Sequence, residues 1–260
     1  MSPNRNLHGD KKPLTAIHGW GFNSAVWDDM GEQLQDQCRF TAIDLPGFGR
    51  CPMLEGEYTL PTLANRLIET TPKSGVLMGW SLGGMVALEM AHCYPEQIDG
   101  LVMVASSPRF TATQNWPHGV APEILNVFSE TVIEDHKAAL LRFLFLQAGR
   151  IDLGRATVKK LKPLLFRYGS PDQKALEKGL ILLRETDSRD ILKTIQCPVL
   201  FILGERDNLL SPTVVEDLSI LCPNCRIAVI NGSAHAPFIS HPLEFFQVLM
   251  SFLQDVYIHD

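Results

Sequence analysis

The segment Gly79-Trp80-Ser81-Leu82-Gly83 sets a serine between two glycines, one two positions before it and one two positions after it. An apolar run at residues 76–78 precedes it and a helical pattern at residues 82–92 follows it, so Ser81 stands at a strand–turn–helix junction. At such a nucleophile elbow the serine backbone is strained, and flanking glycines avoid collisions that a Cβ atom would cause. We therefore predict that Ser81 is the nucleophile of an acyl transfer. The alternative interpretation is a glycine-rich packing turn.

A serine hydroxyl needs a base, and the base needs a carboxylate that orients it. Asp207 and His235 each follow a predicted β-strand. Both residues are therefore expected at the carboxyl ends of parallel strands, where open α/β sheets place their sites. We predict that Asp207 is the acid and His235 the base. Glu205 and Asp44 are rival acids, and the alternative for His235 is a loop or capping histidine.

Acyl transfer also requires N–H donors aimed at the oxygen that becomes negative. In proteins with this elbow, one donor is the backbone N–H after the nucleophile, here Leu82, and the other lies in a loop after an early strand. Residues 17–22 form that loop, and we predict that Trp20 supplies the second N–H while its ring lines the pocket. His18 is predicted to hold the loop in shape through hydrogen bonds, because His235 already fills the role of base.

Short apolar runs bounded by Gly, Pro and Asp predict six β-strands, at residues 14–17, 40–43, 76–78, 101–104, 199–203 and 227–230. Helical apolar spacing falls between most of them, at residues 25–34, 59–70, 82–92, 213–221 and 243–256. Strands that alternate with helices and are apolar on both faces predict an α/β fold. We expect a mostly parallel sheet with helices on both faces.

The alternation stops between residues 109 and 190, where no run reads as a strand. Helical patterns fill this stretch, at residues 122–133, 136–147, 153–166 and 171–183. A structureless loop of this length is uncommon in a compact domain, whereas a helical insertion is not. We predict a core of residues 1–108 and 191–260 with a helical cap, residues 109–190, inserted into it.

The composition is that of an ordinary globular chain of 260 residues, with 45% apolar and 20% charged residues. Its mean hydropathy is +0.04, and its apolar runs are too short for a transmembrane helix. The polar stretch at residues 1–12 predicts no signal peptide, so we expect a cytoplasmic protein. A net charge of −6 argues against a general nucleic-acid surface. Six cysteines are too sparse for a disulfide scaffold; Cys222 and Cys225 are interpreted as structural, with a metal site as the weaker alternative.

Positive charge is concentrated in one part of the predicted cap. Residues 136–168 contain only Asp152 as an acid but eight basic residues, namely Lys137, Arg142, Arg150, Arg155, Lys159, Lys160, Lys162 and Arg167. One-signed charge near a catalytic mouth favours steering of an anionic substrate or acidic partner. The alternative is a solvated face that only keeps the cap soluble. Within the same stretch, residues 143–147 are predicted to wall an acyl channel or to form the core of the cap.

The chain as a whole resembles the α/β hydrolases, and more narrowly the pimeloyl-[acyl-carrier protein] methyl ester esterases of biotin synthesis. Two of the motifs that carry the resemblance are shared by many α/β hydrolases: His18-Gly19-Trp20-Gly21-Phe22-Asn23 and Asp44-Leu45-Pro46-Gly47-Phe48-Gly49-Arg50. The narrower ones are Trp80 before the nucleophile, Ala105-Ser106-Ser107-Pro108 with Asn115-Trp116-Pro117, and Ala234-His235-Ala236-Pro237-Phe238-Ile239-Ser240-His241-Pro242. The order of serine, acid and histidine along the chain is also that of the α/β-hydrolase fold.

The resemblance implies a triad of Ser81, Asp207 and His235 with an oxyanion site formed by Trp20 and Leu82. It implies that the acyl chain is bordered by Phe143, Leu144, Phe145, Leu146 and Gln147. It further implies that basic cap residues receive the acidic acyl carrier protein, with Arg142, Arg155 and Lys159 among the candidates.

The reaction implied is hydrolysis of the methyl ester of pimeloyl-[acyl-carrier protein] by a cytoplasmic monomer that binds neither membrane nor nucleic acid. No metal and no organic cofactor is expected. A promiscuous short-chain carboxylesterase of the same fold is the nearest alternative, followed by a C–C bond hydrolase. An alternative from a different class is a catalytically silent ligand receptor, against which the presence of all three triad residues argues.

Overall fold

The computed structural model describes residues 11–149 and 152–258 of the chain. The polar stretch behind the expectation of no signal peptide therefore lies almost wholly outside the described residues, as does Arg150 of the basic cluster. In the described ranges, no helix is both long enough and apolar enough to cross a membrane.

Six strands form one sheet in the order β2-β1-β3-β4-β5-β6, and every neighbouring pair is parallel. They are β1 (Pro13–Ile17), β2 (Arg39–Ile43), β3 (Gly75–Trp80), β4 (Ile98–Val104), β5 (Val199–Gly204) and β6 (Arg226–Ile230). Strands β1, β3 and β5 are buried along their whole length, whereas the edge strands β2 and β6 are mostly half-buried or exposed. This pattern is typical of a parallel sheet covered by helices, and the predicted α/β fold with its six strands is confirmed.

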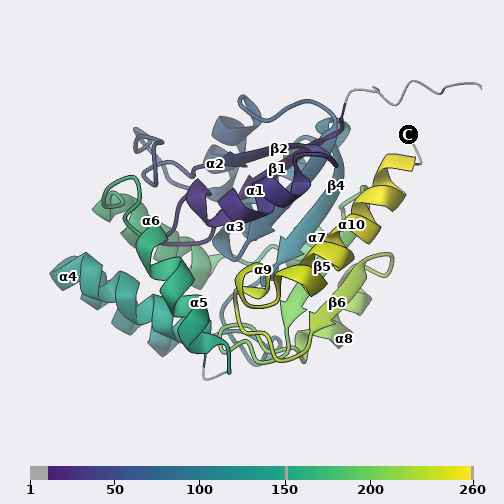
Figure 1. Cartoon of the computed structure of the whole chain (residues 1–260). Helices are drawn as coiled ribbons and strands as arrows, with labels where there is room; N and C mark the ends of the chain where they lie inside the picture. Colours follow the sequence, from purple (N-terminus) through teal and green to yellow (C-terminus); the bar gives the residue numbers. More distant parts are fainter. Residues whose placement is uncertain (1–10, 150–151, 259–260) are drawn as a thin grey trace, which may run out of the picture.

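Outside residues 122–185 the described chain forms the helices η1 (Ser24–Trp27), α1 (Asp28–Leu34), α2 (Leu60–Ile68), α3 (Leu82–Cys93), η2 (Pro95–Gln97), α7 (Arg189–Leu192), α8 (Val214–Leu221), α9 (Pro237–Ser240) and α10 (Pro242–Ile258). Figure 1 shows α1 and α10 lying in front of the sheet. The five predicted core helices are confirmed. The short helices η2, α7 and α9 were not predicted, because three or four residues are too few to show a helical period.

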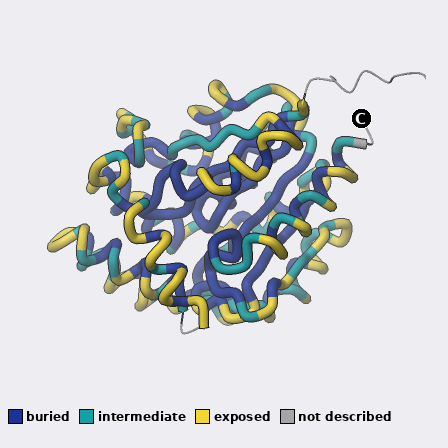
Figure 2. Tube along the Cα trace, in the orientation of Figure 1, coloured by how far each residue is buried: buried dark blue, intermediate teal, exposed yellow. Residues whose placement is uncertain are grey.

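Between β4 and β5 the chain forms α4 (Pro122–Ala148), α5 (Gly154–Leu161), η3 (Lys162–Leu164) and α6 (Gln173–Glu185). We call α4, α5 and α6 the cap helices; they gather beside one end of the sheet (Figure 1). Among the described residues, this stretch adds only isolated β-bridges, such as the one between Arg109 and Asp187. Figure 2 shows the dark, buried sheet at the centre of the molecule and exposed residues along the cap helices.

Helix α4 bends at Asp135, whose φ of −151° and ψ of 90° are not helical. The Asp135 carboxylate accepts hydrogen bonds from the backbone N–H groups of Lys137, at 3.0 Å, and Ala138, at 3.1 Å. It thus caps the second half of α4 in the manner of an N-cap residue. Two separate helices had been predicted on either side of this position, and the kink accounts for the interruption in the pattern.

Several hydrogen bonds fasten the segment between β4 and β5, which contains the predicted cap, to loops elsewhere in the chain. The Trp20 indole N–H donates to the Leu176 carbonyl at 2.9 Å, and the Asn23 amide donates to the Leu164 carbonyl at 2.7 Å. The Asp172 N–H donates to the Gly47 carbonyl at 2.8 Å. All three core residues lie in loops that follow β1 or β2. The cap is therefore held over the carboxyl ends of the strands.

Candidate active site

Ser81 occupies the turn between β3 and α3, and its backbone is strained. Its φ of 55° and ψ of −119° lie in a region that residues with a side chain rarely adopt. The Ser81 N–H donates to the Val104 carbonyl at 2.9 Å, and the Ser106 hydroxyl donates to the Ser81 carbonyl at 2.8 Å. These bonds tie the strained turn to the end of β4, which keeps the Ser81 side chain at the carboxyl edge of the sheet.

Close backbone approach explains the glycines around Ser81. A Cβ atom on Gly79 would lie 2.3 Å from the Gly83 carbonyl oxygen, and one on Gly83 would lie 2.4 Å from the His18 carbonyl oxygen. Real Cβ atoms do not come so near to backbone oxygens, and the backbone cannot give way as a flexible side chain would. A side chain at Gly79 or Gly83 would therefore collide with the backbone, as the sequence pattern predicts.

The structure brings Asp207 and His235 together. Asp207 follows β5, His235 follows β6, and the His235 Nδ1–H donates to Asp207 Oδ2 at 2.7 Å. The other carboxylate oxygen of Asp207 accepts the backbone N–H groups of Leu209 and Leu210. His235 is fully buried and Asp207 is 8% exposed, so the pair lies away from bulk water. This arrangement fixes which imidazole nitrogen carries the proton and leaves Nε2 as the acceptor.

The rival acids bind elsewhere. Glu205 accepts the Gly232 N–H at 2.8 Å, and Asp44 accepts the backbone N–H groups of Ser24 and Arg50. Neither carboxylate contacts His235 in the hydrogen bonds of the described residues. Asp207 is therefore the carboxylate that orients this imidazole.

Ser81 Oγ and His235 Nε2 are both buried, and neither has a hydrogen-bond partner among the described residues. The two residues are linked through Trp80, which precedes Ser81 and whose indole N–H donates to the His235 carbonyl at 2.7 Å. The hydroxyl and the imidazole are thus not hydrogen-bonded to each other. In unliganded enzymes such bonds are often long or misaligned and tighten when substrate binds.

The predicted oxyanion residues both lie near Ser81: Leu82 follows it in the chain, and a Cβ on Gly19, next to Trp20, would lie 3.3 Å from the Ser81 Cβ. Leu82 is the first residue of α3, and the N–H groups of a first helical turn have no partner within the helix. Trp20 lies in the turn closed by the Phe22 N–H and the Gly19 carbonyl. Helix α6 packs directly above both residues, because a Cβ on Gly179 would lie 2.7 Å from the Trp20 ring and 3.4 Å from Leu82. The cap thus covers this part of the site.

Residues 143–147 on α4 divide between the inside and the outside of the cap. Phe143, Leu144 and Gln147 are buried, and the Phe143 ring meets the Trp20 ring edge-on with 4.8 Å between centroids. Leu146 is half-buried, whereas Phe145 is 60% exposed. Phe145 is therefore not part of the buried wall that the others form. Neither amide atom of Gln147 has a hydrogen-bond partner in the described residues.

The sequence profile of the α/β hydrolase fold family matches residues 12–242 of this chain. A pimeloyl-[acyl-carrier protein] methyl ester esterase from Aeromonas hydrophila is 39% identical over 254 residues, which cover 97% of this chain and 100% of that protein. This chain belongs to the pimeloyl-[acyl-carrier protein] methyl ester esterase family of α/β hydrolases. A protein of the same name from Vibrio vulnificus is 38% identical, with 94% of this chain and 95% of that protein covered. The resemblance seen in the sequence motifs is confirmed.

Solved structures of other α/β hydrolases share the fold of this family member. An esterase from Exiguobacterium antarcticum superposes with a TM-score of 0.84 at 21% identity, covering 95% of this chain and 93% of that one. A bromoperoxidase from Bacillus anthracis gives a TM-score of 0.83 at 24% identity, with the same coverage of both chains. Both proteins are less than 25% identical to this chain, and one is an esterase and the other a bromoperoxidase, so the likeness shows the fold alone.

The described Lys and Arg side chains of residues 136–168 are turned outward. Seven of the eight lie among the described residues and all seven are exposed: Lys137, Arg142, Arg155, Lys159, Lys160, Lys162 and Arg167. Arg167 approaches Asp28 at 3.9 Å, and the other six form no ion pair in the described part of the chain. Unpaired charges of one sign produce a field that reaches beyond the surface.

Burial lowers the pKa of His18, which is fully buried, while its bond to Gly19 and the charge of Asp44 raise it less. The neutral ring donates from Nδ1 to the Gly19 carbonyl at 2.8 Å and accepts the Leu45 N–H at Nε2, at 3.0 Å. The bond accepted at Nε2 requires an uncharged imidazole, because a protonated ring has no acceptor. His18 thus holds the Trp20 loop in shape, as its position in the sequence suggests.

Three contacts of His235 have no signal in the sequence. Its N–H donates to the Gln147 carbonyl at 3.2 Å, and the Phe110 ring stands edge-on to the imidazole with 6.0 Å between centroids. The third is the bond from Trp80. These partners lie 88 to 155 positions away along the chain, and no spacing rule reaches that far.

No group of three or more His, Cys, Asp or Glu side chains in the described residues has the geometry to hold a metal ion. Cys222 and Cys225 have free thiols. Burial raises the pKa of Cys225 to about 12 and also raises that of Cys222. A raised pKa makes each thiol less reactive as a nucleophile, because the thiolate is the attacking form.

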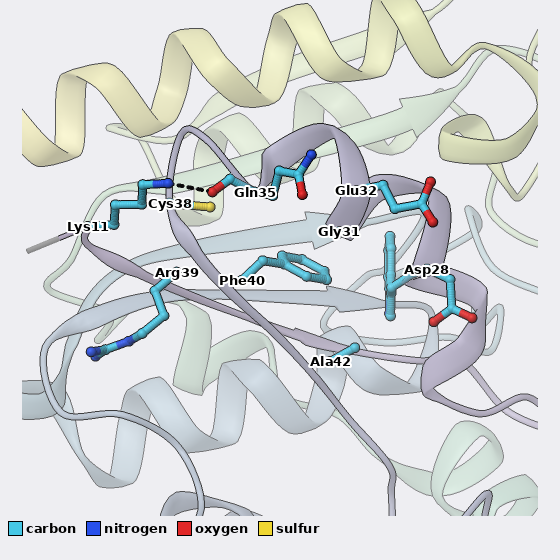
Figure 3. A pocket seen from close by; sticks show the side chains of 10 residues that line it. Lys11, Asp28, Gly31, Glu32, Gln35, Cys38, Arg39, Phe40 and Ala42 are labelled. Atoms are coloured by element: carbon cyan, nitrogen blue, oxygen red, sulfur yellow. Dashed lines mark hydrogen bonds between the residues drawn. The ribbon is translucent and has the colours of Figure 1, made fainter.

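A hollow of about 850 Å³ opens beside the edge strand β2 and helix α1 (Figure 3). It is lined by Lys11, Trp27, Asp28, Gly31, Glu32, Gln35, Cys38, Arg39, Phe40 and Ala42. None of these residues was predicted for the site, and the Lys11 ammonium already donates to the Gln35 carbonyl. The hollow is separate from the candidate active site.

Proposed function

We propose that this protein is a serine carboxylesterase that hydrolyses the methyl ester of pimeloyl-[acyl-carrier protein] to the free acid and methanol in biotin biosynthesis. The observation that carries the chemistry is the buried 2.7 Å bond from His235 to Asp207, with Nε2 of the same imidazole unpartnered. The names of the relatives that are 38–39% identical over nearly the whole chain support the choice of substrate.

In the proposed mechanism, His235 Nε2 takes the proton of Ser81 as the hydroxyl oxygen attacks the ester carbonyl. Asp207 keeps the imidazole in the required tautomer and stabilises its positive charge. The backbone N–H groups of Trp20 and Leu82 receive the negative oxygen of the tetrahedral intermediate. His235 then protonates the departing methanol and activates the water that frees the acid from Ser81.

The acyl chain is proposed to run along the second half of α4, which carries Phe143, Leu144, Phe145, Leu146 and Gln147. The buried members of this segment provide apolar surface next to Trp20, which suits the methylenes of a pimeloyl chain. The Gln147 amide is the one polar group there with free donors and acceptors among the described residues.

The carrier protein is proposed to bind the outer surface of the cap. Arg142, Arg155 and Lys159 are exposed and form no ion pair in the described ranges, so they are available to an acidic partner. We propose residues 109–190 as the cap that this partner touches, and residues 1–108 and 191–260 as the core that performs the chemistry. We further propose that the enzyme acts as a cytoplasmic monomer. Light scattering after size-exclusion chromatography tests whether it is a monomer.

The test compares kcat/KM for methyl pimeloyl-[acyl-carrier protein] with kcat/KM for a free short methyl ester. A dedicated enzyme prefers the carrier-bound substrate by at least about 100-fold, the energy of a few charged contacts. Equal values would instead support the promiscuous short-chain carboxylesterase. The Ser81→Ala variant is the control. It lacks the proposed nucleophile, so any hydrolysis that remains in it is background to be subtracted. Turnover of a ring-cleavage diketone in place of both esters would support a C–C bond hydrolase.

A further inference from the structure

Trp80 joins the nucleophile's end of the site to the base. It is the last residue of β3, directly before Ser81, and it is fully buried. Its indole N–H donates to the backbone carbonyl of His235 at 2.7 Å. A single hydrogen bond therefore links the strand that presents the hydroxyl to the loop that presents the imidazole.

The bond from Trp80 completes a set of contacts that leaves one atom of His235 free. The His235 N–H donates to Gln147, its Nδ1–H donates to Asp207, and its carbonyl accepts from Trp80. Only Nε2 lacks a partner among the described residues. The backbone of His235 is thus fixed from the cap side and from the nucleophile side, and the atom left over is the one that receives the Ser81 proton.

The indole that makes this bond is itself held firmly. Its ring packs against Phe22 and Phe238, each with 5.1 Å between centroids, and lies 6.0 Å from the imidazole. Gly19 lies against its other side, where an added Cβ would be 3.1 Å from Trp80 Cε3. The ring cannot turn without displacing a close-packed neighbour.

Packing alone would be satisfied by another aromatic ring, but the N–H would not. Phenylalanine has no donor, and a fully buried carbonyl without a donor pays the cost of desolvation unless the loop moves to find one. We infer that Trp80 is a positioning residue. Its indole N–H fixes the position of the His235 backbone and thereby the distance between His235 Nε2 and Ser81 Oγ. The inference rests on the proposed function, because the rate of ester hydrolysis is what this distance controls.

The experiment replaces Trp80 with phenylalanine and measures kcat and KM for a short p-nitrophenyl ester. We expect kcat to fall at least about tenfold, since small displacements of reacting groups are costly, while KM stays within twofold. The rate of labelling by a fluorophosphonate is expected to fall by the same factor, because it depends on the same activated hydroxyl. A purely structural role would lower the melting temperature without this split between kcat and KM.

Trp116 offers a matched control. It is 2% exposed, and its indole N–H donates to the half-buried Arg109 carbonyl at 2.9 Å, so Trp116→Phe removes a bond between the same two groups from a residue outside the triad. We expect Trp116→Phe to keep kcat within twofold. If Trp80→Phe does not fold, β-(3-benzothienyl)alanine at position 80 keeps the ring shape and replaces only the N–H with sulfur.

A folded position-80 variant that retains the wild-type kcat would overturn the inference, as would an equal loss of kcat in Trp116→Phe. Failure of the proposed function has a different signature. In that case the wild-type protein itself turns over no ester and takes up no fluorophosphonate, whatever residue stands at position 80.

Discussion

At the carboxyl edge of the sheet, Ser81, Asp207 and His235 are at most 8% exposed, and hydrogen bonds engage every polar group of His235 except Nε2. In residues 136–168, seven described Lys and Arg side chains are exposed and six of them have no ion pair among the described residues. Short-range directional contacts fix the side chains of the first region, whereas among the described basic side chains of the second only Arg167 has an ion pair. From this difference we propose that geometry in the core decides the reaction, whereas long-range charge on the cap governs which substrate arrives.

The largest effect is expected from Asp207→Asn, which changes the hydrogen bond that orients His235 in the buried site. The asparagine can still accept the N–H groups of Leu209 and Leu210 through its oxygen, but it no longer fixes the imidazole tautomer. We expect kcat to fall by about 10³- to 10⁴-fold for free and carrier-bound esters alike. Steady-state kinetics and circular dichroism check the prediction. Glu205→Gln is the matched control, and an equal loss in that variant would reassign the acid.

The next effect concerns the cap surface. Reversing Arg142, Arg155 and Lys159 to glutamate is expected to lower kcat/KM for the carrier-bound ester by about 10- to 100-fold, because an acidic partner is then repelled. The free short ester should be turned over as before. Lys73→Glu is the control, since Lys73 is an exposed lysine far from the cap in the sequence. Unchanged turnover of the carrier-bound substrate would show that this charge serves only solubility.

Two phenylalanines of helix α4 allow the buried site and the exposed surface to be compared within one helix. Phe143 is 1% exposed against the Trp20 ring, whereas Phe145 is 60% exposed. We expect Phe143→Leu to raise KM for a short ester by up to about tenfold, the scale of a lost apolar contact in a pocket. Phe145→Leu should leave this KM within twofold. An equal rise in both variants would mean that Phe145 borders the acyl chain despite its exposure.

The smallest effect is a pH dependence of stability from His18. Because burial lowers its pKa in the folded protein, the unfolded chain binds the proton more readily below about pH 6.5. The stability that neutral His18 contributes is therefore present above that pH and is lost as the pH falls, by up to about 1.4 kcal/mol per pH unit. Urea unfolding of the wild type and His18→Asn between pH 5 and 8 measures it. A difference between the two proteins that does not change with pH would contradict the prediction.

The fold was predictable because its signals are local. Each strand is a short apolar run, and the glycines within two positions of Ser81 indicate the turn that carries it. The kink at Asp135 was also visible as a break between two helical patterns. The four-residue helices α7 and α9 escaped prediction, because one helical turn has no period to detect.

The contacts that position the site were not predictable to the same degree. The bond from Trp80 to His235 spans 155 positions, and the outward direction of Phe145 depends on how α4 lies on the core. Both follow from tertiary packing, which the spacing of residues along one element does not report. The choice of Asp207 over Glu205 likewise became clear only from which carboxylate reaches His235.

The most direct test of the account is to titrate the protein with a fluorophosphonate and locate the adduct by peptide mass spectrometry. The account predicts one equivalent bound, on Ser81, with complete loss of esterase activity and no labelling of Ser81→Ala. Labelling of His235→Ala is expected to slow by several orders of magnitude, because the hydroxyl then lacks its base. An adduct on a different residue, or no adduct in an active protein, would contradict it.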